Sequence, residues 1–375
     1  MSQKLRWLLI VVYVVFLGVL MEGSSRLVLS SPKLSNRLLE YDDKDYWWRS
    51  TWISRHQTSG TEIFYKFDLF DASKGWISKP NLRDMTVFGN KVLNTNSKGF
   101  RGTTEHSYAK DPNRRRIVLL GDSFTFGDEV SDDEVYAHYL QEMLPNVEVI
   151  NLGVHGYGHD QMLILLREEG LKYQPDIVIV GFLTMDMSRN LLSFRDYAKP
   201  RFVLDHGALK LTGTPIPTPE GFLKHDRLRP RLFDIFSIAR HRVVKLSGSP
   251  ETERETEKQA VTTAILTEIV NLTDGIHAVP MFAYLPPGGE LADHSPRTPG
   301  ENYLFSFCRE HVQARCLSAR PQFAEKAAQG VTFGTKLHWG PEGHRATAET
   351  IKQFLVDQGF VVNPASATAA GSEKP

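Results

Sequence analysis

The chain has 375 residues, which is enough for one large domain or for two. With 41% apolar, 10% aromatic and 23% charged residues, its composition is that of a folded protein and excludes a chain that is disordered throughout. Lysine plus arginine and aspartate plus glutamate both number 44, so the formal charge is zero. This balance argues against nucleic acid as the main partner, because nucleic-acid binding needs a basic excess.

The amino terminus carries a positive flank followed by an apolar run. Lys4 and Arg6 precede the uncharged stretch 7–21, and no Ala-x-Ala cleavage site follows it. We therefore predict that residues 1–24 form an uncleaved signal anchor, which would place the rest of the chain on the far side of the membrane. A cleaved signal peptide and a buried helix remain alternatives, because the run of 15 apolar residues is short for a membrane span.

Residues 25–112 show little sustained helical period and are rich in aromatic side chains. We interpret them as an accessory region of short strands and turns packed against the main domain. The aromatic residues fit a small aromatic core, and they also fit a surface that stacks on sugar rings. Within this region the segment Asn96–Gly102 is turn-like, because its glycines can adopt positive φ angles.

A regular alternation of strands and helices occupies residues 113–362, interrupted by a proline-rich insertion at about 190–258. This alternation predicts an α/β fold with a central parallel sheet and helices on both faces. We expect the tail, residues 363–375, to be disordered. The predicted strands are 117–120, 147–152, 176–182, 277–285 and 314–317, and the predicted helices are 132–144, 160–171, 256–271, 301–312 and 341–358.

A serine follows the first of these strands at a tight turn. Gly121 ends the strand, and Ser123 would be presented at the carboxyl edge of the sheet, where its backbone N–H faces the same crevice. Gly153 ends the next strand, so its N–H would lie beside Ser123 and could bind an oxyanion. His338 precedes the last helix and is the candidate base, whereas His344 inside that helix is expected to pack.

Three spaced motifs resemble those of the SGNH (GDSL) hydrolase family. They are Gly121–Phe124, Asn151–Gly153 and His338–His344, and Asn96–Gly102 also resembles a segment that precedes the serine strand in membrane-anchored bacterial members. The resemblance covers roughly residues 90–190 and 275–358. It implies a flavodoxin-like three-layer α/β/α sandwich. It also implies hydrolysis or transfer of ester-linked acyl groups, frequently acetyl groups on sugars, without a metal or other cofactor.

The chain departs from the family pattern at two positions. Met185 stands where the family carries an oxyanion-hole asparagine, and Thr184 or Asn190 are the candidate substitutes. A thioether donates no hydrogen bond, and losing one oxyanion donor typically costs about 10²–10³ in rate.

The second departure concerns the acid that orients the histidine. Thr335 and Lys336 occupy the positions where the family carries an aspartate. A serine–histidine dyad, or an approach of Asp186 from another loop, could replace that acid. Asp122 is expected to brace the serine turn through backbone hydrogen bonds.

These observations predict an extracytoplasmic serine esterase or O-acyltransferase, with Ser123 as nucleophile and His338 as base. The resemblance places it at a bacterial inner membrane, acting on an acylated cell-envelope glycan and meeting polysaccharide assembly proteins. The alternative is a degenerate relative that binds glycan or an assembly partner without turnover. Cys308 and Cys316 lack zinc-site spacing, and either a disulfide or two separate thiols fits them.

Overall fold

The computed structural model describes residues 2–30, 44–59, 63–246, 250–290, 296–334 and 337–362. The predicted disordered tail, 363–375, lies outside these residues. The chain divides into two compact units, each considered by itself below. The sheet unit comprises Tyr65–Ser193, Lys199–Ile216 and Lys258–Pro375, and the helical unit comprises Met1–Phe64, Phe194–Ala198 and Pro217–Glu257.

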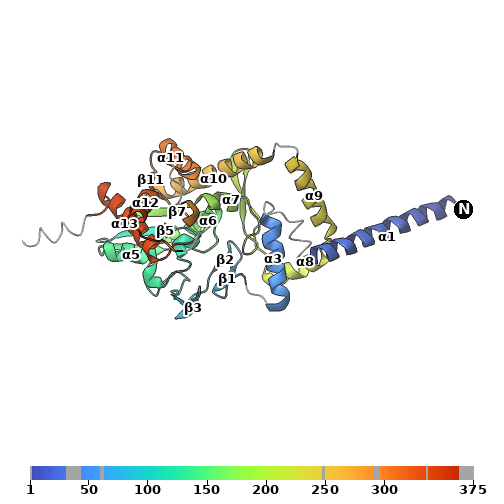
Figure 1. The fold of residues 1–375 in the computed structure, drawn as a ribbon, viewed down its shortest axis with the longest axis horizontal. Helices are drawn as coiled ribbons and strands as arrows, with labels where there is room; N and C mark the ends of the chain where they lie inside the picture. Colours follow the sequence, from blue (N-terminus) through green and yellow to red (C-terminus); the bar gives the residue numbers. More distant parts are fainter. Residues whose placement is uncertain are drawn as a thin grey trace, which may run out of the picture. The chain divides into compact units, whose positions relative to one another are not determined.

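A parallel sheet, five-stranded within the described residues, forms the centre of the sheet unit (Figure 1). Its order is β6-β5-β7-β10-β11, which reads 2-1-3-4-5 when the strands are counted along the chain. This order is that of flavodoxin-like folds, so the predicted fold class is confirmed. In such sheets ligands bind beyond the carboxyl ends of the first and third strands, here β5 and β7. The strands are β5 (Arg115–Leu120), β6 (Val147–Asn151), β7 (Ile177–Phe182), β10 (Val279–Tyr284) and β11 (Arg315–Ser318).

Helices cover both faces of this sheet, as the buried apolar strands require. On one face, strand residues such as Ile179 share an apolar core with helix residues such as Ile351. On the other face, Phe182 stacks on His159. The α-helices of this unit include α4 (Ser123–Phe126), α5 (Tyr136–Met143), α6 (His159–Glu168), α7 (Thr184–Arg189), α11 (Pro299–Glu310), α12 (Arg320–Ala328), α13 (Pro341–Asp357) and the later part of α10 (Pro250–Asp274). Its 3-10 helices are η1 (Asp132–Glu134), η2 (Gly170–Tyr173) and η3 (Gly288–Glu290).

Among the described residues, three antiparallel strand pairs also belong to the sheet unit. Residues 65–112, which we predicted as part of an accessory region, lie in the same unit as the sheet. The reason is aromatic packing: Phe67 stacks on Phe126 of the serine turn, and the buried Trp76 donates to the carbonyl of His155. The pairs are β1 (Asp68–Asp71) with β2 (Gly75–Ser78), β3 (Met85–Val87) with β4 (Lys91–Leu93), and β8 (Arg201–Asp205) with β9 (Ala208–Thr212).

The helical unit contains one long apolar helix, α1 (Gln3–Ser30), which is long and apolar enough to cross a membrane. Its described helices also include α3 (Lys44–Ser59), α8 (Pro219–Leu228) and α9 (Leu232–Leu246). The prediction of short strands and turns was wrong at α3. That helix is held by an aromatic cluster, in which Trp52 stacks on His56 and packs against Tyr197 and Phe222. Such a cluster depends on partners distant in sequence.

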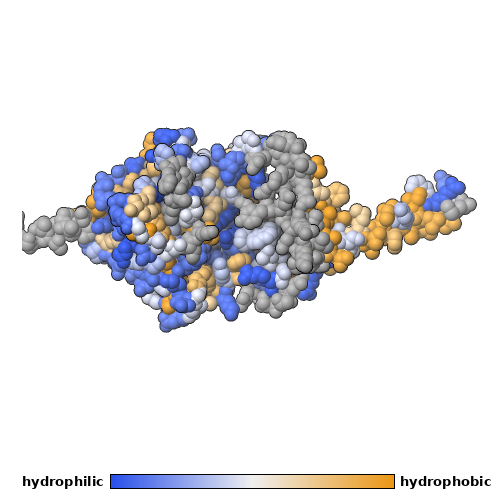
Figure 2. Space-filling view, viewed as in Figure 1, coloured by the Kyte–Doolittle hydropathy of each residue, from blue (hydrophilic) through white to orange (hydrophobic). Residues whose placement is uncertain are grey.

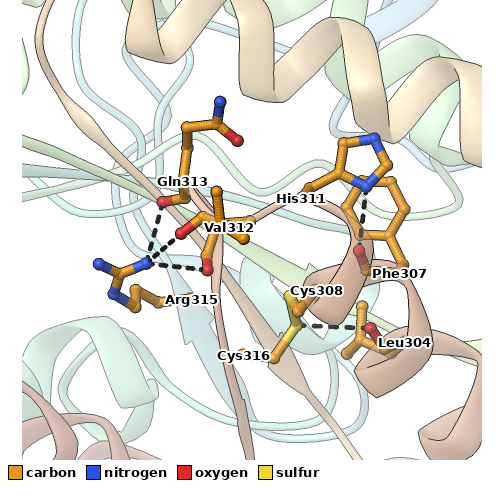
Figure 3. Close-up of a disulfide and its surroundings, with 9 residues drawn as sticks. Leu304, Phe307, Cys308, His311, Val312, Gln313, Arg315 and Cys316 are labelled. Atoms are coloured by element: carbon orange, nitrogen blue, oxygen red, sulfur yellow. Dashed lines mark hydrogen bonds between the residues drawn. A yellow bond between two sulfur atoms is a disulfide. The ribbon is translucent and has the colours of Figure 1, made fainter.

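Cys308 and Cys316 form a disulfide that joins α11 to β11 (Figure 3). Their Cα atoms are 6.2 Å apart, within the range that a disulfide spans. The alternative of two separate thiols is therefore excluded in this structure.

Candidate active site

The serine turn connects the end of β5 at Leu120 to the start of the short helix α4 at Ser123. Asp122 caps the single turn of α4, its Oδ1 accepting the N–H of Phe124 at 3.0 Å. This bond to the backbone is the kind of contact expected of Asp122. Ser123 occupies the first helical position, where an N–H has no intrahelical acceptor. The Ser123 hydroxyl also lies at the carboxyl edge of the sheet, 3.4 Å from Asp122 Oδ2.

His338 reaches Ser123 from the loop that precedes α13. Its Nε2 lies 2.9 Å from Ser123 Oγ, a hydrogen-bond distance for a nucleophile and its base. The neighbouring Trp339 is buried and donates to the carbonyl of Pro286 at 2.8 Å, which anchors the loop. The structure thus brings together the two residues that the sequence proposed as nucleophile and base, although they are far apart along the chain.

Glu129 is a carboxylate beside His338 that the sequence interpretation missed. Its Oε1 lies 3.3 Å from His338 Nδ1, on the side of the ring opposite Ser123. Thr335 and Lys336, the positions that the motif resemblance assigns to the acid, lie outside the described residues. Glu129 instead follows the serine motif, in the Gly127-Asp128-Glu129 segment. The sequence contains this carboxylate, but it does not indicate that the Glu129 side chain points toward His338.

A left-handed turn brings Glu129 back toward the serine. Gly127 ends α4 with φ at 92°, and the N–H groups of Gly127 and Asp128 both donate to Ser123 O at 2.9 Å. Glu129 itself has φ at 67°, an uncommon conformation for a residue other than glycine. Backbone conformations of this kind cost free energy and persist only where the surrounding structure imposes them. Here the consequence is a carboxylate placed against the histidine.

Arg101 clamps this turn from the Asn96–Gly102 segment. Its guanidinium donates to the carbonyls of Gly127 and Val130, each at 2.6 Å, and to Asp132 Oδ1 at 2.8 Å. The side chain is almost completely buried, and this burial lowers the pKa of Arg101. The segment that looked like a simple turn therefore supplies the charge that holds Glu129 in position.

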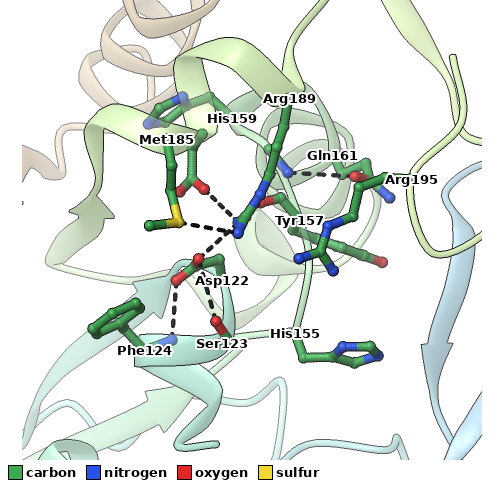
Figure 4. Close-up of polar contacts among 12 residues, drawn as sticks. Asp122, Ser123, Phe124, His155, Tyr157, His159, Gln161, Met185, Arg189 and Arg195 are labelled. Atoms are coloured by element: carbon green, nitrogen blue, oxygen red, sulfur yellow. Dashed lines mark hydrogen bonds and ion pairs between the residues drawn. The ribbon is translucent and has the colours of Figure 1, made fainter. Parts of the chain in front are cut away.

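Behind the serine lies a buried network around Arg189 (Figure 4). The Nη1 of Arg189 contacts Asp122 Oδ2 at 2.7 Å and Asp186 Oδ1 at 2.5 Å. Asp186 therefore pairs with Arg189 in this structure, where no contact between Asp186 and His338 is described. Met185 directs its Sδ at Arg189 Nη2, 3.3 Å away. The thioether of Met185 therefore accepts a hydrogen bond here and cannot donate one.

The groups proposed for the oxyanion hole differ in how they are used. The N–H of Gly153 donates to Asn151 Oδ1 at 2.9 Å, so this predicted donor already has an acceptor. Asn190 donates to Thr262 at 2.9 Å, which assigns its amide a structural contact. Thr184 Oγ1 lies 3.3 Å from the Tyr284 hydroxyl. The Ser123 N–H has no hydrogen-bond acceptor within the described parts of the chain.

A second carboxyl group, Asp128, is buried beside the base. It is 4% exposed, and its Oδ1 has no hydrogen-bond partner within the described parts of the chain. Burial raises the pKa of Asp128 to about 6, although the charges of His155, His338 and Arg101 oppose that rise. By contrast, burial lowers the pKa of His344 to about 3, and its Nδ1 accepts the Tyr136 N–H at 3.3 Å. His344 therefore has the packing role expected of it.

No family model matches, and no curated protein matches. The similar solved structures include a lipolytic G-D-S-L family protein from Veillonella parvula, with 13% identity, a TM-score of 0.39, and coverage of 64% of this chain and 97% of that one.

Esterase EstA from a Pseudoalteromonas species has 15% identity and a TM-score of 0.36, with 64% of this chain and 98% of that chain covered. A two-domain esterase active on acetylated mannans has 14% identity and a TM-score of 0.38, with coverage of 67% and 51%. The match thus spans about half of that two-domain protein. The solved structures to which this chain is similar include members of the lipolytic G-D-S-L family, esterases and a protein described as an acylhydrolase.

Proposed function

We propose that this protein is a serine esterase or O-acyltransferase that acts on ester-linked acyl groups, with acetyl as the expected group. The observation that carries the proposal is the contact of Ser123 Oγ with His338 Nε2 at 2.9 Å, with Glu129 on the opposite ring nitrogen. Nucleophile, base and orienting acid are arranged in the order that serine acyl transfer requires.

In the proposed reaction, Ser123 Oγ attacks the acyl carbonyl while His338 Nε2 takes the hydroxyl proton. The tetrahedral intermediate places its negative charge on the former carbonyl oxygen, where the Ser123 N–H binds it. Gly153 can add a second donor only by sharing or releasing its bond to Asn151. Collapse of the intermediate expels the alcohol, which receives the proton from His338. Water or a sugar hydroxyl then takes the acyl group in the reverse sequence of proton transfers.

Glu129 has the role of orienting the ring and stabilising the imidazolium that forms during attack. Its side chain is 35% exposed, so its electrostatic effect is partly screened by solvent in the free protein. A bound acyl substrate would cover the site and exclude water, which strengthens such interactions.

The location and substrate class complete the proposal. We infer that α1 anchors the protein in a bacterial inner membrane and that the site faces the extracytoplasmic side. The length and apolar character of α1 support the anchor, and the disulfide between Cys308 and Cys316 supports an oxidising compartment. The acylated glycan, and a partnership with polysaccharide assembly proteins, follow from the resemblance of the sequence motifs.

A second candidate function is binding of glycan or of an assembly partner without turnover. Two observations favour it: Met185 stands at the family's asparagine position, and the Gly153 N–H already has an acceptor. Labelling with a fluorophosphonate separates the two, because the reagent requires an activated serine.

The test uses the full chain in detergent, with hydrolysis of p-nitrophenyl acetate measured beside labelling. We expect labelling of the wild type, and loss of both labelling and hydrolysis, by at least about 10³-fold, in Ser123→Ala. Ser107→Ala alters an exposed serine outside the site and is the matched control. Unlabelled wild type, with hydrolysis unchanged in Ser123→Ala, would refute the enzyme and favour the binding protein.

Glu129→Gln tests the orienting acid separately. It retains the size of the side chain but removes its charge, and we expect kcat to fall by about 10²–10⁴ while KM changes little. Asp133→Asn removes a neighbouring exposed carboxylate and should leave kcat unchanged. An unchanged kcat in Glu129→Gln would show that the serine and histidine act as a dyad.

A further inference from the structure

The helix α9 presents an apolar row to solvent within the helical unit. Phe233, Phe236 and Val243 are each about two-thirds exposed, at 65%, 67% and 67%. Their spacing of three and seven residues places them along one side of a helix. The opposite side is buried, with Asp234 1% and Ile238 6% exposed. Large exposed apolar side chains gathered in a row mark a surface that another apolar phase covers.

Ion pairs fix which side of α9 faces inward. Asp234 pairs with Arg229 and, at 3.4 Å, with Arg231. Arg231 also pairs with Asp226, which Arg49 of α3 contacts at 2.6 Å. Because these charges hold the Asp234 side of the helix against its own unit, the phenylalanine side cannot turn inward.

The start of α9 is attached to α1 where its apolar stretch ends. Glu22 is the first charged residue after the run 7–21. Its two carboxylate oxygens accept the N–H groups of Arg231 and Leu232, both at 3.0 Å, and so cap α9. Arg26, one turn further along α1, donates to the carbonyl of Arg229 at 3.2 Å. Two polar contacts one turn apart thus hold the beginning of α9 against α1.

The attachment of α9 to α1 fixes where the apolar row lies along the axis of α1. A helix rises 1.5 Å per residue, so Glu22 and Arg26 lie about 1.5 and 7.5 Å along the helix axis beyond the end of the apolar run, which is at most about one and a half turns. Phe233 and Phe236 lie in the first one or two turns of α9, directly after the residues bound to Glu22. Figure 2 shows apolar surface beside the root of the projecting α1 helix, and Figure 1 shows α9 crossing the direction of α1.

We propose that α9 lies in the interfacial region of the lipid bilayer, with Phe233, Phe236 and Val243 inserted among the headgroups and upper acyl chains. The inference rests on the proposed membrane anchoring of α1 and adds a second contact, parallel to the membrane surface. Aromatic side chains suit this region, and an exposed Arg240 between Phe236 and Val243 can extend its guanidinium toward phosphate groups. The consequence is that α1 is not a free tether, because the helical unit is held against the membrane.

The test uses the full chain in vesicles of phosphatidylethanolamine and phosphatidylglycerol, prepared with and without bromine on the acyl chains. Single cysteines replace exposed residues and carry a bimane fluorophore. The native Cys308 and Cys316 are joined and do not compete for the label. The test positions are Phe233→Cys, Phe236→Cys and Val243→Cys. Val19→Cys in α1 is the positive control. Val312→Cys, which replaces a residue 75% exposed in the sheet unit, is the matched negative control.

We expect bromine to quench the three α9 probes to a degree approaching that at Val19, and to leave the probe at Val312 unchanged. Quenching at Val19 without quenching at α9 would overturn the inference while leaving the anchor intact. If the α9 probes were shielded from aqueous iodide but not quenched by bromine, a protein partner would cover the helix and the inference would be wrong. A probe at Val19 that is not quenched would refute the anchor and the inference together. Ester hydrolysis, measured in the same vesicles, reports on the proposed activity independently of these outcomes.

Discussion

Arg101 is the residue through which the accessory segment stabilises the serine turn, so Arg101→Met should affect both stability and catalysis. The variant keeps much of the apolar length of the side chain but removes five donors. The buried carbonyls of Gly127 and Val130 lose their hydrogen bonds, and Asp132 loses its cation. Removing one partner of a buried ion pair costs about 3–5 kcal/mol, and we expect a decrease of this size in the free energy of unfolding.

The same substitution should slow the reaction, because the carbonyls that Arg101 holds flank Glu129. A displacement of about 1 Å in a catalytic group can cost about 10²-fold in rate, and we expect a loss of that order in kcat. Unfolding is followed in urea by the fluorescence of Trp76 and Trp339, which are buried in the sheet unit. Turnover is followed with p-nitrophenyl acetate.

Lys91→Met is the matched control for Arg101→Met. Lys91 of β4 pairs with Glu134 of η1 at 2.8 Å, but both side chains are about 30% exposed. Exposed pairs of this kind contribute about 0–1 kcal/mol. If Arg101→Met decreased stability by no more than Lys91→Met does, the view of Arg101 as the clamp of the serine turn would be refuted.

Three further predictions concern groups around the site and the disulfide. The pKa of Asp128 is raised from 3.8 to about 6, so between these pH values the folded protein binds more protons than the unfolded chain. The free energy of unfolding should therefore fall by about 3 kcal/mol as the pH rises through this window. Asp128→Asn should abolish that decrease, as measured by urea unfolding. In Gly153→Ala the new Cβ would lie 2.6 Å from the Thr125 carbonyl carbon, and we expect a loss of about 1–3 kcal/mol together with impaired fluorophosphonate labelling. Replacing Cys308 and Cys316 by alanine opens a short loop and should lower the free energy of unfolding by about 2–3 kcal/mol.

Each of these predictions has its own control. The pH series is repeated on Asp133→Asn, whose exposed carboxylate should leave the slope unchanged; an unaltered slope in Asp128→Asn would assign the pH dependence to other groups. Gly289→Ala places a Cβ where no atom lies within 4 Å, so it should be neutral, and equal effects of the two glycine variants would contradict the packing argument. For the disulfide, dithiothreitol should destabilise the wild type but not the alanine variant.

Much of the fold is determined by local patterns in the sequence. The strands of the sheet are short apolar runs buried on both faces, and helices with an apolar side separate them, so a parallel α/β sheet follows from the pattern alone. Because every parallel strand ends at the same edge, Ser123 and His338 could be assigned to one site. The α3 helix was missed because most of its apolar residues are aromatic and the partners of Trp52 are distant in sequence. The membrane anchor, the glycan and the catalytic roles remain predictions.

The serine turn shows most clearly which features follow from local sequence and which depend on tertiary contacts. The sequence by itself determined that Ser123 follows a buried strand at a tight turn, since apolar strand, glycine and polar cap are all local signals. Only the tertiary structure decided that Glu129 faces the histidine, that Arg101 clamps the turn, and that Asn151 engages the Gly153 N–H. Those outcomes depend on a left-handed turn at Gly127 and on the directions of individual side chains. The local sequence constrains these side-chain orientations weakly, because they are set by contacts between segments that lie far apart along the chain.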